Sequence, residues 1–217
     1  MKKLQPLLVA TMILLFTSSY AQRTTKTYLD IMINGSSNGL NYGSNNGAVS
    51  DYKKSVKGIQ AGASFQAGIT PAFSVVSELY YIRKGGKLTA ANPLTVSETS
   101  LKLNTFEIPV LARIHLGRFY MNAGPSVSYA FSGKYKIDDK STRISFTNST
   151  GGYKRFDAGV QVGGGFEFPF KQKRLALDVR YNHGLTNISR TTEMYNRGII
   201  VSVYVSKAWK NNPLAMK

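Results

Sequence analysis

The sequence predicts an all-β protein, an eight-stranded antiparallel up-and-down transmembrane β-barrel with short periplasmic turns and long outer loops. Three observations predict this fold. Apolar and polar residues alternate with a period of two in eight segments, as in strands whose two faces differ. The connections between these segments alternate between long and short, which is typical of outer-membrane barrels. Only 18% of the residues are charged and 12% are aromatic, a balance that favours a chain facing lipid.

The chain begins with the features of a secretory signal peptide. Positive charge at Lys2 and Lys3 precedes an apolar run at 7–16, and small residues then fit a cleavage site before Gln22. The alternative, an uncleaved membrane helix, needs about 20 apolar residues, roughly twice this run. The expected division is a cleaved signal peptide at 1–21, a barrel at 22–209 and a periplasmic C-terminal tail at 210–217.

The 28 Lys and Arg residues against 11 Asp and Glu give a formal net charge of +17, and the chain has no cysteine. Without thiols, disulfide scaffolds, thiolate zinc sites, iron–sulfur sites and cysteine nucleophiles are excluded. A basic chain rich in aromatic residues also fits a nucleic-acid-binding protein. Export argues against nucleic acid as a partner, because the mature chain leaves the compartment that holds it.

Alternation justifies each predicted strand. From Phe156 to Phe168 every second residue is apolar, aromatic or glycine, and the residues between them are small or polar. Segments beginning at Ile59 and Phe119 repeat the pattern. Small and polar side chains suit a narrow interior, so the apolar face is expected to contact lipid. The predicted strands cover residues 26–34, 57–69, 73–84, 101–115, 119–131, 155–168, 173–183 and 198–209.

The predicted connections differ between the two sides of the membrane. Long polar connections are expected on the outer side, and an even number of strands places both the N- and C-termini in the periplasm. The protein is therefore expected in the bacterial outer membrane. The long connections are 35–56, 85–100, 132–154 and 184–197, and the short ones are 70–72, 116–118 and 169–172.

The fourth predicted strand is the least regular. Leu101, Leu103 and Thr105 share one parity, whereas Phe106 and Ile108 begin an apolar series of the other parity. A bulge near Thr105 and Phe106 would bring both series onto the lipid face.

The inward positions concentrate the acidic residues. A midplane Arg or Lys on the lipid face costs about 2–4 kcal/mol, so charges within the strands are expected inside, with Lys102 and Arg155 inward near the outer end. Tyr80, Tyr120 and Tyr204 also point inward, which predicts a plugged core. These charged residues are expected to form an internal network of salt bridges and hydrogen bonds. The alternative is that they line a pathway for protons or a substrate. The predicted interior polar network comprises Asp30, Glu78, Glu107, Arg113, Asp157, Glu167, Asp178 and Arg180.

Catalytic chemistry finds little support in the sequence. Of the two histidines, His115 is expected inward at the periplasmic end and His183 near the outer rim. His183 with Ser189 and Glu193 would suit an outer-leaflet lipid-modifying enzyme, an alternative for which the spacing fixes no geometry. The glycine run at 163–165 lacks the Lys-Ser/Thr of a phosphate loop. No catalytic, cofactor-binding or metal-ligating residue is predicted.

Most basic residues fall in the predicted outer loops. A basic rim beside outer-membrane lipid matches the anionic phosphates of lipopolysaccharide, and a solvated charged rim is the alternative. The expected lipopolysaccharide-contacting residues are Lys53, Lys54, Lys134, Lys136, Lys140 and Arg143.

Several segments, in order, resemble the PorT-type outer-membrane β-barrel family. They are residues 77–87, 106–113, 123–129, 156–168, 178–188 and 196–204. The resemblance implies an eight-stranded outer-membrane barrel of a Gram-negative bacterium, without catalytic residues or cofactors. The family's namesake works in a protein-secretion apparatus, so other envelope or secretion proteins are further candidate partners. The resulting expectation is a non-enzymatic structural or interaction protein, with an accessory role in secretion as the alternative.

Overall fold

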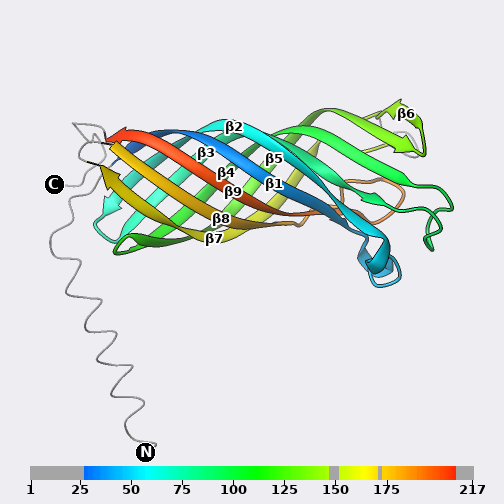
Figure 1. Ribbon diagram of the computed structural model, residues 1–217, viewed down its shortest axis with the longest axis horizontal. Coiled ribbons are helices and arrows are strands. Elements are labelled where there is room, and N and C mark those ends of the chain that lie inside the picture. Colours follow the sequence, from blue (N-terminus) through cyan, green and yellow to red (C-terminus); the bar gives the residue numbers. More distant parts are fainter. Residues whose placement is uncertain (1–26, 147–151, 171–172, 209–217) are drawn as a thin grey trace, which may run out of the picture.

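The computed structural model describes residues 27–146, 152–170 and 173–208 (Figure 1). One antiparallel sheet holds nine strands, and two short 3₁₀ helices lie between the first two of them. The strands are β1 (Tyr28–Asn41), β2 (Lys53–Thr70), β3 (Phe73–Leu88), β4 (Thr99–Leu116), β5 (Phe119–Ile137), β6 (Lys140–Arg143), β7 (Phe156–Phe170), β8 (Lys173–Gly184) and β9 (Tyr195–Ala208), and the 3₁₀ helices are η2 (Gly43–Asn45) and η3 (Ser50–Tyr52).

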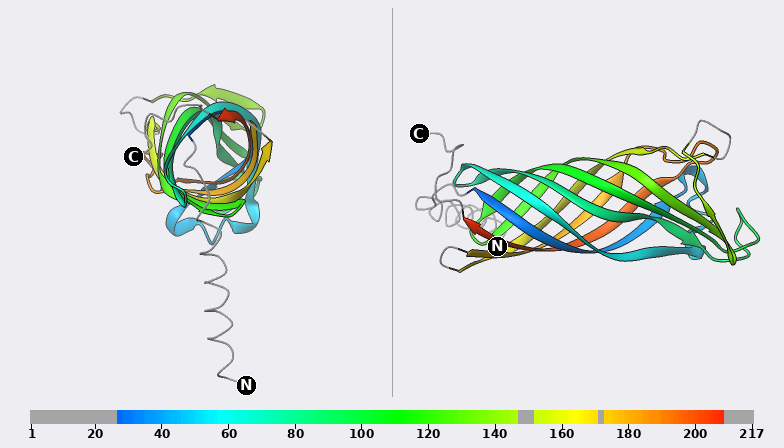
Figure 2. Two further views of the ribbon diagram at one scale, coloured as in Figure 1. Left: turned by 90° about the vertical axis from the view of Figure 1, so that its left-hand side faces the viewer. Right: turned by 90° about the horizontal axis from the view of Figure 1, so that it is seen from above.

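Eight of these strands close into a barrel. Each pairs antiparallel with the next, and β1 pairs with β9 along its whole length, from Tyr28 opposite Ala208 to Asn41 opposite Tyr195. The short strand β6 pairs only with β5 and lies outside the ring. A view along the axis shows the closed ring (Figure 2). The predicted eight-stranded antiparallel up-and-down barrel is therefore confirmed.

The strands extend further at the outer end than the sequence predicts. β1 continues to Asn41 and β5 to Ile137, where residues from 35 and from 132 onward were expected in loops. The Gly-, Ser- and Asn-rich ends have low strand propensity, but neighbouring strands supply partners for their backbone groups. At about 3.3 Å per residue and a tilt of about 40°, a strand as long as β5 rises nearly twice the roughly 25 Å apolar band of an outer-membrane barrel.

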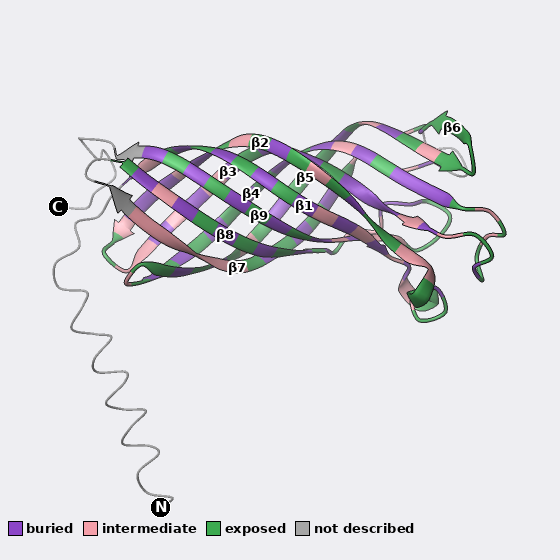
Figure 3. Ribbon diagram, viewed as in Figure 1, coloured by how far each residue is buried: buried purple, intermediate pink, exposed green. Residues whose placement is uncertain are grey.

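The two faces of the strands differ in burial, as the alternating colours along each ribbon show (Figure 3). Large apolar side chains on the outer wall are widely exposed, for example Ile31 at 73% and Ile59 at 83%. A continuous exposed apolar surface is unstable in water and indicates contact with lipid. Leu79, Ile108, Met121, Val162, Leu177 and Val203 continue this lipid-facing belt around the barrel.

The bulge expected in the fourth strand lies in its neighbour. β4 keeps one parity throughout, with Leu101, Leu103 and Thr105 all buried inside. The ladder pairs Asn104 with Ser132 but Thr105 with Ala130, which leaves Phe131 of β5 as the extra residue. The predicted bulge in β4 is therefore wrong, and Lys102 faces outward, contrary to prediction.

Glycines make room for the large side chains in the lumen. A Cβ at Gly62 would overlap Tyr80, and one at Gly165 would overlap the hydroxyl of Tyr120. A Cβ at Gly163 would lie 2.7 Å from Cγ of Arg180. The inward glycines thus supply the volume that the inward tyrosines and arginines occupy.

A separate apolar core lies in the outer extension of the barrel. Leu88, Leu101 and Leu103 from β3 and β4 pack with Val49 and Ile188 from the outer loops. Here the apolar side chains point inward, the reverse of the arrangement in the lipid-facing belt. Among the described residues, no helix is long and apolar enough to cross a membrane.

Candidate functional site: the interior network and the outer basic face

The interior network begins near the end of the barrel at which β1 starts. Arg174 of β8 donates two hydrogen bonds to Asp30 of β1, at 2.9 and 2.6 Å, and a third to Glu167 at 2.8 Å. Gln66 accepts hydrogen bonds from both Arg174 and Arg113, each at 2.8 Å. This amide therefore bridges two buried guanidinium groups.

Arg180 occupies the centre of the lumen. It lies 2.8 Å from carboxylate oxygens of Glu78 and Asp178, and all three side chains are fully buried. Tyr204 donates to Glu78 at 2.8 Å and accepts from Arg180 at 2.8 Å. Because Glu78 is on β3 and Arg180 is on β8, the cluster crosses the lumen.

The network continues to the outer end through Gln161. This amide accepts a hydrogen bond from Arg180 at 3.0 Å and donates to Glu107 at 3.3 Å. Lys84 then joins Glu107 at 3.0 Å and Asp157 at 3.3 Å, and Asn196 donates to Asp157 at 2.8 Å. Polar contacts thus connect one end of the lumen to the other.

All eight residues predicted for the interior network lie inside the barrel, although Glu167 remains partly exposed. Sequence reasoning missed Arg174 and Lys84, both 2% exposed. Lys84 shares the parity of Glu78 and Tyr80 on β3 and is buried with them. Arg174 shares the parity of Asp178 on β8, so alternation carried the signal in both cases.

Buried charged side chains of this kind are stable only when an oppositely charged partner is present. Removing one member of a buried ion pair leaves a desolvated charge and costs about 3–5 kcal/mol. Side chains from different strands therefore hold the network in one arrangement. The large buried residues Arg113, Tyr80, Tyr120 and Tyr204 fill the same lumen.

The histidines lie in different environments. His115 is buried near the end of β4, with Nε2 at 2.9 Å from the hydroxyl oxygen of Ser74. His183 is exposed on the outer wall. Within the described residues no hydrogen bond joins His183 to Ser189 or Glu193; Glu193 instead accepts from the backbone N–H of Ser44 at 2.9 Å. The structure does not assemble the lipid-modifying triad.

The six predicted rim residues lie at the outer end but in two places. Lys53 and Lys54 begin β2, and Lys53 donates to Asn46 at 2.8 Å. The other four are exposed on β5 and β6, the hairpin that projects from the barrel (Figure 1). Of these four, Lys136 alone has an ion-pair partner in the described chain, Asp139 at 3.3 Å.

Three cations form a row across the outer wall. Lys102 of β4 is directly opposite Lys134 of β5, which is directly opposite Arg143 of β6. All three are exposed, and none has an acidic partner among the described residues. Like charges directly opposite each other in a sheet are destabilising. We name Lys102, Lys134 and Arg143 the cationic row.

Aromatic side chains lie below the cationic row, toward the lipid-facing belt. Phe131 packs against Phe106 and Tyr81, with ring centroids 5.0 and 6.2 Å apart. Arg155 was expected inside, but it lies over the ring of Phe146, with its guanidinium carbon 4.3 Å from the centroid. Aromatic girdles mark the membrane interface of such barrels, so the cationic row lies on the loop side of one such girdle.

A closed antiparallel ring with an apolar outer wall and a charged interior defines an integral β-barrel membrane protein. Residues 20–190 match the family described as outer membrane protein beta-barrel domain, and the chain belongs to that family. The protein is accordingly a bacterial outer-membrane barrel. A comparison with curated proteins gave no match.

Solved outer-membrane barrels are similar over most of the chain. Ail, the attachment invasion locus protein of Yersinia pestis, is 10% identical, with a TM-score of 0.44 over 86% of this chain and 100% of its own. Neisserial surface protein A is 13% identical, with a TM-score of 0.45 over 83% and 97%. OprG of Pseudomonas aeruginosa is 12% identical, with a TM-score of 0.39 over 85% and 95%.

Proposed function

We propose that this protein is a non-enzymatic outer-membrane barrel whose outer basic face binds the phosphate groups of lipopolysaccharide. The cationic row is the observation that carries the proposal. Three exposed cations side by side, without acidic partners in the described chain, repel one another unless an anion lies between them. Lys and Arg form charge-assisted hydrogen bonds with phosphate oxygens, which would turn this repulsion into attraction.

The position of the cationic row supports a lipid phosphate over a soluble anion. On β4, Lys102 is two outward-facing positions beyond Phe106. At about 3.3 Å per residue this separation is roughly 13 Å along the strand, so the cations lie on the loop side of the aromatic residues that mark the membrane interface. The proposed orientation places both termini in the periplasm, after export directed by the signal peptide at 1–21. Residues 1–26 and 209–217 lie outside the described part of the chain.

Charge reversal tests the proposal. In Lys134→Glu/Arg143→Glu, the amount of lipopolysaccharide that co-purifies with each folded barrel should fall about tenfold, because two charge-assisted contacts become repulsive. The matched control Arg118→Glu/Lys173→Glu changes the net charge equally at exposed positions on the opposite end of the barrel. Equal lipopolysaccharide in both variants would reject the proposal. Migration on unheated gels identifies the folded fraction in each case.

A second proposal, an accessory role in protein secretion, comes from the resemblance of the sequence to PorT-type barrels. The ordered resemblance of six strand segments favours it, and the projecting β5–β6 hairpin offers a surface for an envelope partner. Deleting the gene should then trap exported cargo in the periplasm. Unchanged release of cargo would contradict this role without affecting the lipopolysaccharide proposal.

A further inference from the structure

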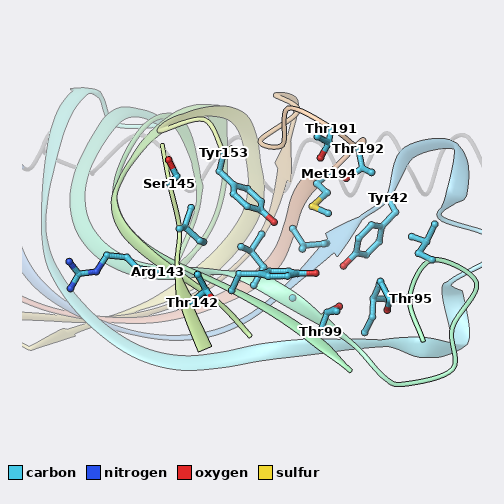
Figure 4. A pocket seen from close by; sticks show the side chains of 17 residues that line it. Tyr42, Thr95, Thr99, Thr142, Arg143, Ser145, Tyr153, Thr191, Thr192 and Met194 are labelled. Atoms are coloured by element: carbon cyan, nitrogen blue, oxygen red, sulfur yellow. The ribbon is translucent and has the colours of Figure 1, made fainter. Parts of the chain in front are cut away.

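A cavity of about 570 Å³ opens at the outer end of the barrel (Figure 4). Its walls come from the outer ends of the strands and from the segment before β9. The apolar lining comprises Leu40, Leu88, Leu94, Leu101, Ile144 and Met194. A cavity of this volume with mostly apolar walls has the dimensions of a site for a small organic molecule.

Hydroxyl groups supply most of the polar lining, from three tyrosines and from the smaller side chains of Thr95, Thr99, Thr142, Ser145, Thr191 and Thr192. Tyr42, Tyr135 and Tyr153 line it, and Tyr42 and Tyr153 direct their hydroxyls toward its middle (Figure 4). Within the described residues, none of the three tyrosine hydroxyls forms a hydrogen bond. Burial raises the pKa of Tyr153 to about 12, with a further contribution from Tyr135, and burial also raises the pKa of Tyr42. The phenols of Tyr42 and Tyr153 are therefore neutral at physiological pH and can donate or accept hydrogen bonds.

Charge is nearly absent from the cavity. Among the described residues, Arg143 is the one charged residue in its lining, and its guanidinium extends away from the cavity (Figure 4). An ionised group on a ligand would have no counter-ion inside and would lose its hydration on entry. The cavity therefore favours an uncharged molecule.

The interior network closes the cavity from below. On β3, Lys84 is one inward position below Gly86, which lines the cavity. Its ion pairs with Glu107 and Asp157, together with Asn196, join strands on different sides of the lumen at this level. A molecule that enters from outside would meet Lys84, Glu107 and Asp157, which are already paired with one another. The arrangement favours capture at the outer surface over passage through the barrel.

We propose that this outer cavity binds an uncharged, largely apolar small molecule whose hydroxyl or carbonyl oxygen hydrogen-bonds with the tyrosine hydroxyls. The apolar walls bind the hydrocarbon part, and the phenols distinguish an oxygen-bearing ligand from a pure hydrocarbon. Arg143 belongs both to the cavity lining and to the cationic row, but its guanidinium extends away from the cavity, so binding here does not depend on lipopolysaccharide.

Three naphthalene probes test the chemistry of the site. The full barrel is assembled in phosphatidylcholine nanodiscs free of lipopolysaccharide, and binding of 1-naphthol, naphthalene and 1-naphthoate is measured by saturation-transfer NMR against empty nanodiscs. 1-Naphthol should bind most tightly and 1-naphthoate most weakly. Binding of 1-naphthol no greater than in empty nanodiscs, or equal binding of 1-naphthoate, would overturn the proposal.

Two kinds of variant locate the site. Tyr42→Phe/Tyr153→Phe removes two hydroxyls while keeping both rings, and should weaken 1-naphthol binding about fivefold per hydroxyl without changing naphthalene binding. Thr192→Trp places a bulky side chain at the exposed edge of the cavity and should abolish binding of both. Ser141→Trp, exposed on β6 outside the lining, is the matched control. Unchanged 1-naphthol binding in the tyrosine variant or in Thr192→Trp would reject this cavity as the site.

Discussion

The stability of the barrel should depend strongly on Arg180. Replacing it with methionine keeps most of the side-chain volume but removes the cation that Glu78 and Asp178 share. All three side chains are fully buried, so the two carboxylates cannot gain hydration in compensation. Loss of one member of a buried ion pair costs about 3–5 kcal/mol, which lowers the folding equilibrium constant by roughly two to three and a half orders of magnitude.

The assay is urea unfolding of the barrel in lipid vesicles, with the folded fraction read from its migration on unheated gels. Lys136→Met is the matched control, since Lys136 pairs with Asp139 at the surface, with the two side chains 47% and 106% exposed. An exposed pair contributes about 0–1 kcal/mol, so the control should unfold nearly as the native protein does. Neutralising Glu78 as well, in Arg180→Met/Glu78→Gln, should recover part of the lost stability, because Asp178 keeps Arg113 as an ion-pair partner at 3.8 Å. Equal destabilisation by Arg180→Met and Lys136→Met would refute the reasoning.

Three further predictions follow from the same structure. Planar bilayers containing the barrel should show no stepwise conductance, because buried side chains cross the lumen; large stable steps would contradict a filled interior. Gly165→Ala should destabilise the folded barrel by about 2 kcal/mol or more in a urea titration, because the added Cβ overlaps the Tyr120 hydroxyl. Gly117→Ala is the control: this glycine lies at a turn with no atom within 4 Å of an added Cβ, so the variant measures only the smaller cost of its positive φ. Stability should fall as the pH rises from 10 to about 12, because Tyr153 and Tyr42, whose pKa values burial raises, then ionise only in the unfolded chain. Tyr153→Phe should make this slope shallower, and an unchanged slope would exclude a contribution from Tyr153.

Alternation was sufficient to predict the barrel and most of its interior. In a strand, neighbouring side chains point to opposite faces, so one correctly assigned residue fixes the rest of that strand. The acids at 78, 107 and 178 could therefore be placed inside from sequence alone. The pairing of each acid could not be predicted, because it depends on which side chains meet inside the closed ring: Glu78 pairs with Arg180 on the opposite side, whereas Glu107 pairs with Lys84 on the neighbouring strand. The alternation along one strand contains no information about contacts across the lumen.

The outer ends of the strands could not be predicted from alternation, for a different reason. Residues 35–41 of β1 are rich in Gly, Ser and Asn, which resemble a loop by composition. They form a strand because β9 offers backbone partners as far as Tyr195 opposite Asn41. Pairing of this kind is a tertiary interaction, and it outweighs the low intrinsic strand propensity of these residues.

The error in β4 shows where the membrane ends. Within the lipid belt apolar side chains point outward, and that rule assigned Leu101 and Leu103 to the lipid face. Above the belt the surroundings are aqueous, so the same strand, without changing parity, turns apolar residues inward and Lys102 outward. The inversion lies between Phe106, exposed in the aromatic girdle, and Leu103, buried in the outer core. Both the cationic row and the tyrosine-lined cavity lie above this inversion, in the part of the barrel that is built like a water-soluble protein, and the proposed lipopolysaccharide contact belongs to its edge nearest the lipid belt.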